Sequence, residues 1–247
     1  MRCAPFVMRC APWMISRAKA VFFCSAVLLS WSAKPCLAED VPLPPRRPPI
    51  AQPLPAAAQD DVSLDADCAG LLRDKRMEGD ILPDVMGANG CGIVSPVLLK
   101  TILLENGAKI AVTPPVLMRC TLAAALVQWL RADVAVALAG DNQRLTGLAS
   151  AGGYECRSRN RIAGSAPSEH GHGNAIDIAA FLVAPGPPLA IGSAAASRDV
   201  FQKIHQSACA RFMTVLGPGS DGFHESHLHL DLQPRRSETH ICQWQIN

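Results

Sequence analysis

Histidines and carboxylates gather in two short segments near the C-terminus. The segments are Ser168-Glu-His170-Gly-His172-Gly-Asn-Ala-Ile-Asp177 and His224-Glu-Ser-His227-Leu-His229-Leu-Asp231. Together they hold five of the seven histidines in the chain. Zinc prefers imidazole and carboxylate ligands, and a catalytic zinc keeps one coordination position open for water. The two segments therefore predict a mononuclear zinc site.

Three side chains of these segments are expected to hold the metal. His170 and Asp177 lie seven residues apart, and they can meet on one ion if His170 precedes a strand that contains Asp177. Gly171 and Gly173 permit the tight backbone that this arrangement requires. His229 then supplies the third ligand from a neighbouring strand. We therefore expect one Zn²⁺ per chain, bound by two imidazoles and one carboxylate.

Other side chains of the same segments have the chemistry to act beside the metal. His227 lies two residues before His229, so on a strand it would share a face with that ligand and act as general base, with Glu225 as the alternative base. Asp231, on the same face, can accept a hydrogen bond from a liganding histidine and orient it. Ser168 is expected to be a hydrogen-bonding residue of the loop and not a nucleophile, because activated water already has that role.

The remaining histidines are expected to lie outside the metal centre. His172 belongs to the first segment but is predicted to be exposed, and His224 is predicted to lie at the rim of the site. His205 and His240 are interpreted as surface residues, because an isolated histidine has no partner for chemistry in the sequence.

Alternating polar and apolar residues predict that both segments continue as strands. In 175–179 Asp177 shares a face with two alanines, whereas Ile176 and Ile178 take the other face. In 227–232 two histidines and an aspartate share one face, and three leucines take the other. A period of two residues is typical of a strand with one buried face. We therefore expect an α+β fold, with an antiparallel sheet packed with helices.

Helices and a further strand are predicted around the site. A short helix is expected over 65–77 and a strand over 109–113. Thr113 and Pro114 have the residue types that begin a helix, and Gly140 has the type that follows one, so a long apolar helix is expected between them. Ser197 is expected to cap another helix over 198–212, with its apolar side turned inward.

The N-terminal residues have the composition of an export signal. Residues 1–38 contain basic residues, no acidic residue, and an apolar run over 20–33 that is short for a membrane span. A cleaved signal peptide is therefore expected over 1–38, with an uncleaved anchor as the alternative. Residues 39–61 are rich in proline and are interpreted as a linker. The folded domain is expected over 62–247.

Charge and hydropathy limit the partners of the exported chain. Without residues 1–38 it carries 18 basic and 21 acidic residues, a formal charge of −3. This balance gives no argument for nucleic-acid binding. The apolar stretch 116–139 is interrupted by charged residues, so membrane contact is expected only through an uncleaved signal. We expect a monomer in the periplasm or outside the cell.

An even number of cysteines remains after the signal, which in an exported protein predicts three disulfides. They are Cys68, Cys91, Cys120, Cys156, Cys209 and Cys242. Six cysteines allow 15 pairings. The pairing expected here joins sequence neighbours, namely Cys68–Cys91, Cys120–Cys156 and Cys209–Cys242.

The two histidine segments resemble a known signature. The pattern Ser-x-His-x-x-Gly-x-Ala-x-Asp, followed by His-x-His, is similar to that of the LAS metallopeptidases, a group of lysostaphin-type endopeptidases, D-alanyl-D-alanine carboxypeptidases and the hedgehog signalling domain. From about Cys68 to Cys242 the chain more closely resembles the bacterial extensin-like C-terminal domain. The matching segments are Gly90-Cys91-Gly92, Pro114-Pro115, Gly153-Tyr154, Cys156-Arg157, Ser168-Glu-His170, Asn174–Phe181, Val215–Pro218 and His227–Asp231.

This resemblance implies a hedgehog/DD-peptidase-like fold stapled by disulfides. It assigns His170, Asp177 and His229 as zinc ligands and His227 as the base. Arg157 matches an arginine that contacts the substrate carbonyl or terminal carboxylate, although beside Cys156 it has a surface salt bridge as its alternative role. The chain lacks the Glu-x-x-His spacing of many carboxypeptidase relatives.

The implied activity is that of a zinc-dependent peptidase acting on cell-wall peptidoglycan, as a carboxypeptidase or an endopeptidase. The alternative from another class is a non-catalytic module that binds peptidoglycan or has a structural role and keeps the same fold. A phosphoesterase is less favoured, because the residues offer no second metal set.

Overall fold

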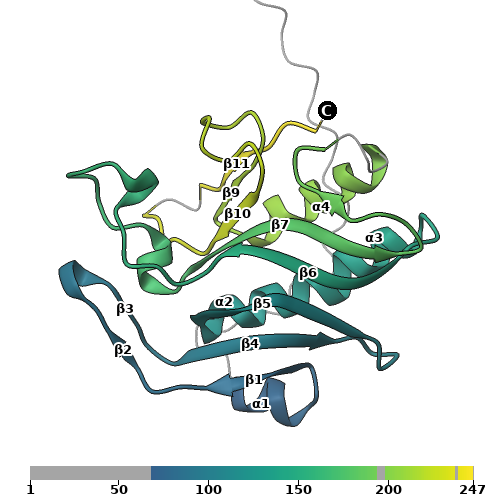
Figure 1. Ribbon diagram of the computed structural model, residues 1–247, viewed down its shortest axis with the longest axis horizontal. Helices are drawn as coiled ribbons and strands as arrows, with labels where there is room; N and C mark the ends of the chain where they lie inside the picture. Colours follow the sequence, from purple (N-terminus) through teal and green to yellow (C-terminus); the bar gives the residue numbers. More distant parts are fainter. Residues whose placement is uncertain (1–67, 194–197, 237–238, 247) are drawn as a thin grey trace, which may run out of the picture. The chain divides into compact units, whose positions relative to one another are not determined.

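The computed structural model describes residues 68–193, 198–236 and 239–246 (Figure 1). The expected signal, 1–38, and the linker, 39–61, lie outside the described residues. The helices are α1 (Cys68–Arg73), α2 (Cys120–Trp129), α3 (Ala135–Ala139) and α4 (Arg198–Arg211). The strands are β1 (Met77–Ile81), β2 (Val85–Met86), β3 (Gly92–Ile93), β4 (Pro96–Leu103), β5 (Lys109–Arg119), β6 (Arg144–Gly152), β7 (Ala175–Ala184), β8 (Leu189–Ala190), β9 (Thr214–Leu216), β10 (Leu228–Asp231) and β11 (Ile241–Gln243).

One large mixed sheet organises these elements. Its strand order is β1-β4-β5-β6-β7-β10-β9-β11, with β8 paired to β7, whereas β2 and β3 form a separate hairpin. Most pairings are antiparallel, but β5–β6 and β9–β11 are parallel. The predicted combination of helices with a largely antiparallel sheet is therefore confirmed, and the two parallel pairings are additions that the sequence did not indicate.

The helices α2, α3 and α4 pack against one face of the sheet (Figure 1). A π-helical turn, Leu130–Val134, joins α2 to α3, so that Cys120–Ala139 is continuous. This helix is long and apolar enough to cross a membrane by length and composition. Trp129, Leu126 and Leu130 are nonetheless fully buried in the core, where Trp129 makes edge contacts with Phe181 and Phe212.

The strands β7 and β10 lie side by side in the middle of the sheet and have the predicted alternation. Ile176 and Ile178 on β7, and Leu228 and Leu230 on β10, belong to the core that the helices cover. Asp177 on β7, with His229 and Asp231 on β10, takes the opposite face. We call this side of the sheet the open face, and it is where the polar side chains of both segments come together.

The long helix begins later than the sequence predicted, which corrects the roles given to Thr113 and Pro114. The strand β5 continues through both prolines to Arg119, and the helix starts at Cys120. Between the pairs Thr101–Ala111 and Leu99–Val116 the β4–β5 register shifts, so several β5 residues face a single β4 residue. Proline lacks a backbone N–H, and it is tolerated there because the ladder is interrupted.

The other predicted helices agree in part with the structure. Gly140 follows the end of α3 as expected. The helix α4 buries Val200, Phe201, Ile204 and Ala208, as predicted, while its proposed cap Ser197 lies outside the described residues. The helix expected over 65–77 ends at Arg73, because Met77 already belongs to β1 and is buried in the core.

Three disulfides are present in the described part of the chain, but two of the expected pairings are wrong. The bonds are Cys68–Cys120, Cys91–Cys156 and Cys209–Cys242, so only the last was predicted correctly. The fold brings α1 against α2 and thereby Cys68 to Cys120. The turn of the β2–β3 hairpin lies next to Cys156, whose Sγ is 3.5 Å from the Ala88 carbonyl. Such disulfides form in oxidising compartments, which agrees with a periplasmic or extracellular location.

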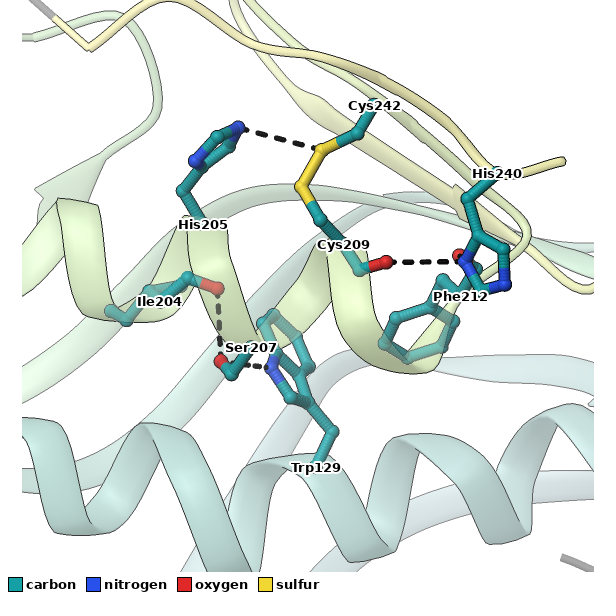
Figure 2. The surroundings of a disulfide bond; sticks show 8 residues. All are labelled: Trp129, Ile204, His205, Ser207, Cys209, Phe212, His240 and Cys242. Carbon is teal, nitrogen blue, oxygen red and sulfur yellow. Dashed lines mark hydrogen bonds between the residues drawn. A yellow bond between two sulfur atoms is a disulfide. The ribbon is translucent and has the colours of Figure 1, made fainter. Parts of the chain in front are cut away.

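The disulfide Cys209–Cys242 ties the short strand β11 to α4. Figure 2 shows this disulfide with His205 on one side of it, His240 on the other and Trp129 below. We expect that replacing both cysteines with serine lowers the free energy of unfolding by about 4 kcal/mol, because the unfolded chain is then no longer closed into a loop. Guanidinium unfolding would measure this loss. An unchanged unfolding midpoint would contradict this contribution of the disulfide to stability.

Candidate metal centre

The three predicted ligands come from three elements that meet on the open face. In the β7–β10 pairing, His229 lies directly opposite Asp177. His170 belongs to a short 3₁₀ turn, Glu169–His172, just before β7. The Ser168 side chain caps this turn by accepting a hydrogen bond from the His170 backbone N–H, at 3.4 Å. Gly173 ends the turn in the left-handed region, at φ 61°, so a glycine there turns the chain into β7 without strain.

The ligand atoms of these three side chains converge on one point. The distance from His170 Nε2 to His229 Nδ1 is 3.2 Å, that from His229 Nδ1 to Asp177 Oδ1 is 3.0 Å, and that from His170 Nε2 to Asp177 Oδ1 is 3.2 Å. With zinc–nitrogen bonds of about 2.0–2.1 Å, the ligands of a tetrahedral site lie roughly 3.3 Å apart. All three residues are buried. The residues present therefore fit a single zinc ion.

The outer nitrogen of each histidine is held by an oxygen acceptor. His170 Nδ1 lies 2.7 Å from the Gly153 carbonyl, and His229 Nε2 lies 3.1 Å from Asp231 Oδ2. When these nitrogens donate to the acceptors, the inner nitrogens have free lone pairs that face Asp177. Histidine ligands are usually oriented in this way by a carboxylate or carbonyl partner. Asp231 thus lies where the sequence placed it.

We call His170, Asp177 and His229 the triad, and the electrostatics of their surroundings favour a positive charge between them. Burial alone would raise the pKa of Asp177, but its hydrogen bonds with His170 and His229 outweigh burial and hold that pKa well below its usual range. Burial would likewise lower the pKa of His229, yet the hydrogen bonds to Asp177 and Asp231 raise it to about 9. The two buried carboxylates therefore stabilise a cation between them, and a bound dication supplies that charge.

His227 lies next to the triad but outside it. It precedes β10, it is half-buried, and its Nε2 is 3.8 Å from Asp177 Oδ1. The alternative base, Glu225, is turned away, because both of its carboxylate oxygens accept hydrogen bonds from the backbone N–H of Gly219, at 3.1 and 3.2 Å. Of the two candidates, His227 is the one whose side chain faces the triad.

His224 is more central than the sequence indicated, which corrects its expected place at the rim. It is buried, with its ring centroid 5.0 Å from that of His227 and 5.5 Å from that of His229. Its Nδ1 lies 2.7 Å from Asp221 Oδ1. Burial raises the pKa of Asp221, but the hydrogen bonds from His224 and from the Phe223 backbone N–H, together with the charge of His224, outweigh burial and lower that pKa. In the sequence, the one indication that His224 has a partner is Asp221, three residues before it.

The other histidines have no described contact with the triad. His172 is half-buried in the same turn as His170. His240 is exposed, as expected, and its Nδ1 lies 3.1 Å from the Cys209 carbonyl. His205, expected at the surface, is half-buried, and its Nε2 lies 3.4 Å from Cys242 Sγ of the disulfide (Figure 2). The ligand atoms of His205, Cys209 and Cys242 lie close together, but Cys209 and Cys242 are bonded to each other, so of these three only His205 could bind a metal.

A cavity of about 260 Å³ lies beside the triad on the open face, and we call it the charged cavity. The adjacent strands β10, β9 and β11 form its floor. On these strands His229 pairs with Leu216, and Leu216 pairs with Gln243. Arg157 lines this cavity while its Nε donates to Glu155 Oε2, at 2.9 Å. The salt bridge considered for Arg157 is thus present, and the residue also lines the cavity, while its contact with a substrate stays a prediction.

The sequence did not indicate two residues of the charged cavity that reach the triad through Asp231. Thr214 makes a side-chain hydrogen bond with the Asp231 carboxylate. Arg235 Nη2 donates to Thr214 Oγ1, at 2.6 Å, and its Nη1 donates to the Met213 carbonyl. Arg235 lies in an irregular segment after β10, so no periodicity marks it.

Gly153 gives a test of how the backbone supports the centre. A Cβ at this position would lie 2.3 Å from Val116 Cγ1 on β5, so a side chain must displace the Gly153 backbone, whose carbonyl holds His170. We expect Gly153→Ala to cost about 1–3 kcal/mol of stability and to weaken zinc binding. Denaturant unfolding and metal titration would measure the two effects. Gly140→Ala is the matched control, because a Cβ there lies 3.4 Å from its nearest neighbour and the backbone is helical.

Comparison with known proteins identifies the family. The family model for the extensin-like protein C-terminus matches residues 66–243, which include all the elements described above. No curated protein and no solved structure matches the chain. Because the matched region covers well over half of the sequence, the chain belongs to the extensin-like protein C-terminus family.

Proposed function

We propose that this protein is an exported zinc-dependent hydrolase that cleaves peptide bonds of cell-wall peptidoglycan. The observation that carries the proposal is the convergence of His170 Nε2, His229 Nδ1 and Asp177 Oδ1 within 3.2 Å of one another, each histidine with an outer acceptor. The similarity of the two histidine segments to the LAS metallopeptidase signature supports the choice of reaction and of a hedgehog/DD-peptidase-like fold. The disulfides support export.

Zinc in this position would lower the pKa of water and polarise a carbonyl group. The side chains around it have separate roles in the proposal. His170, Asp177 and His229 hold the metal. His227, half-buried beside Asp177, accepts the proton of the attacking water at Nε2 and returns it to the leaving amine. Arg157, fixed by Glu155 at the wall of the charged cavity, donates hydrogen bonds to the oxygen on which negative charge develops.

The proposal is tested by metal analysis together with digestion of purified peptidoglycan. We expect about one zinc per chain and new peptide termini among the soluble fragments, detected by mass spectrometry. A protein that stays metal-free in the presence of zinc contradicts the proposal. A zinc-loaded protein that binds peptidoglycan and produces no new termini, whether or not His227 is replaced by alanine, would instead identify a non-catalytic wall-binding module.

A further inference from the structure

A second cavity, of about 270 Å³, lies where β5 and β6 separate. These strands pair only from Ala111 to Thr113 with Gly147 to Ala149. Beyond that point the links between them are the hydrogen bonds from Ser150 Oγ to the Pro114 carbonyl, at 2.6 Å, and from the Tyr154 backbone N–H to the Leu117 carbonyl, at 3.0 Å. The separation leaves a slot between the strands, which we call the uncharged cavity.

The uncharged cavity opens on the same face of the sheet as the metal centre. Of the residues that line it, Leu98 alternates along β4 with Val97 and Leu99, which are buried in the core. On β5, Leu117 alternates in the same way with the buried Val116 and Met118. Since successive side chains of a strand point to opposite faces, Leu98 and Leu117 point to the open face, as Asp177 does.

The uncharged cavity also adjoins the triad. Gly152, one of its lining residues, lies opposite Asp177 in the β6–β7 pairing, and a Cβ on Gly152 would be 3.0 Å from Asp177 Oδ2. The next residue, Gly153, holds His170 through its carbonyl. The charged cavity meets the triad from the other side, through His170 and His229. Two glycines therefore stand between the uncharged cavity and the metal centre, and the cavity approaches the triad as closely as their backbone allows.

The two cavities differ in chemistry. The charged cavity is lined by Arg157, Arg159 and Arg235, together with three acidic residues. The uncharged cavity is lined by prolines, glycines, aliphatic side chains, Ser150 and Tyr154, and none of its lining residues carries a charge. A cavity without a cation has nothing to bind a terminal carboxylate.

We propose that peptide chain is bound on both sides of the metal centre, so that the protein cleaves internal or cross-linking bonds and is an endopeptidase. This inference rests on the proposed function and names its substrate class. A site that removes one terminal residue needs room for a single residue and a cation beyond the scissile bond. In the charged cavity, Arg157 Nε is paired with Glu155 and Arg235 is engaged by Met213 and Thr214, so the exposed Arg159 is the one arginine of that cavity without a described side-chain partner. The uncharged cavity, on the other side of the triad, has no cation at all among its lining residues.

The test compares two peptidoglycan peptides with the zinc-loaded protein. One is a cross-linked dimer of stem peptides, and the other is an uncross-linked stem peptide, each with free or amidated C-termini. We expect the dimer to be split into monomers at a rate that does not depend on amidation. Release of only the terminal residue, abolished by amidation, overturns the inference but leaves the proposed function standing, and would point to Arg159 as the carboxylate partner. No cleavage of either peptide overturns both.

A variant of the uncharged cavity separates binding from metal chemistry. Ala151 is exposed and lines this cavity, so Ala151→Phe fills it without disturbing the core. We expect the KM for the dimer to rise about tenfold, a loss of about 1.4 kcal/mol, with zinc affinity unchanged. Val136→Phe, at an exposed position on α3, is the matched control and leaves KM unchanged. An unaltered KM in Ala151→Phe would show that the substrate does not use this cavity.

Discussion

Replacing His227 with alanine is expected to lower kcat for peptide hydrolysis by ~10²–10⁴-fold while zinc remains bound. The reason is positional: His227 adjoins the triad, with Nε2 3.8 Å from Asp177 Oδ1, but none of the converging ligand atoms belongs to it. Removal of its imidazole takes away a proton acceptor and leaves His170, Asp177 and His229 in place. Metal analysis and steady-state kinetics on the cross-linked peptide would measure the two quantities.

Glu225→Gln is the matched comparison for His227, since Glu225 is the other acid–base residue of the same segment. Its carboxylate accepts two hydrogen bonds from the Gly219 backbone N–H and does not face the triad. The variant is therefore expected to keep most of its activity. The reverse result, with a large loss in Glu225→Gln and little change in His227→Ala, would transfer the role of base to Glu225.

The central strands and the polar site could be predicted from sequence because they obey a local rule. A strand with one buried face repeats every two residues, and in β10 the leucines mark the covered side so clearly that His229 and Asp231 must lie on the other. Asp177 on β7 follows the same rule. The distance between the two segments along the chain did not matter, since neighbouring strands bring their same-face residues together.

Features that depend on tertiary contacts could not be read from the sequence. Thr113 and Pro114 have residue types that fit the start of a helix and also an interrupted strand, and only the register shift against β4 decides for the strand. The pairing of Cys68 with Cys120 requires the packing of α1 on α2. His224 looked peripheral because its neighbours in the centre come from its own loop and from β10, and the uncharged cavity follows from the separation of two parallel strands that no motif marked.

Replacing His170 with alanine is expected to abolish zinc binding and, with it, a large part of the stability of the metal-loaded protein. Free zinc at a thousand times its Kd adds about 4 kcal/mol to the free energy of unfolding, and this gain disappears when the ligand set is broken. The wild type should therefore lose thermal stability on addition of a chelator, whereas His170→Ala should melt at the same temperature with and without it.

His172→Ala is the control for this experiment, because His172 lies two residues away in the same turn and has no described contact with the triad. It is expected to bind zinc and to respond to the chelator as the wild type does. If His170→Ala bound zinc with undiminished affinity, the converging geometry would have to be explained by hydrogen bonds alone. The two buried carboxylates, Asp177 and Asp231, would then be neutralised by protonated His229 rather than by a metal, which is the arrangement that its raised pKa of about 9 would permit. The chelator response of His170→Ala distinguishes these two states directly, since only a metal held by His170 loses its effect on the melting temperature when that side chain is removed.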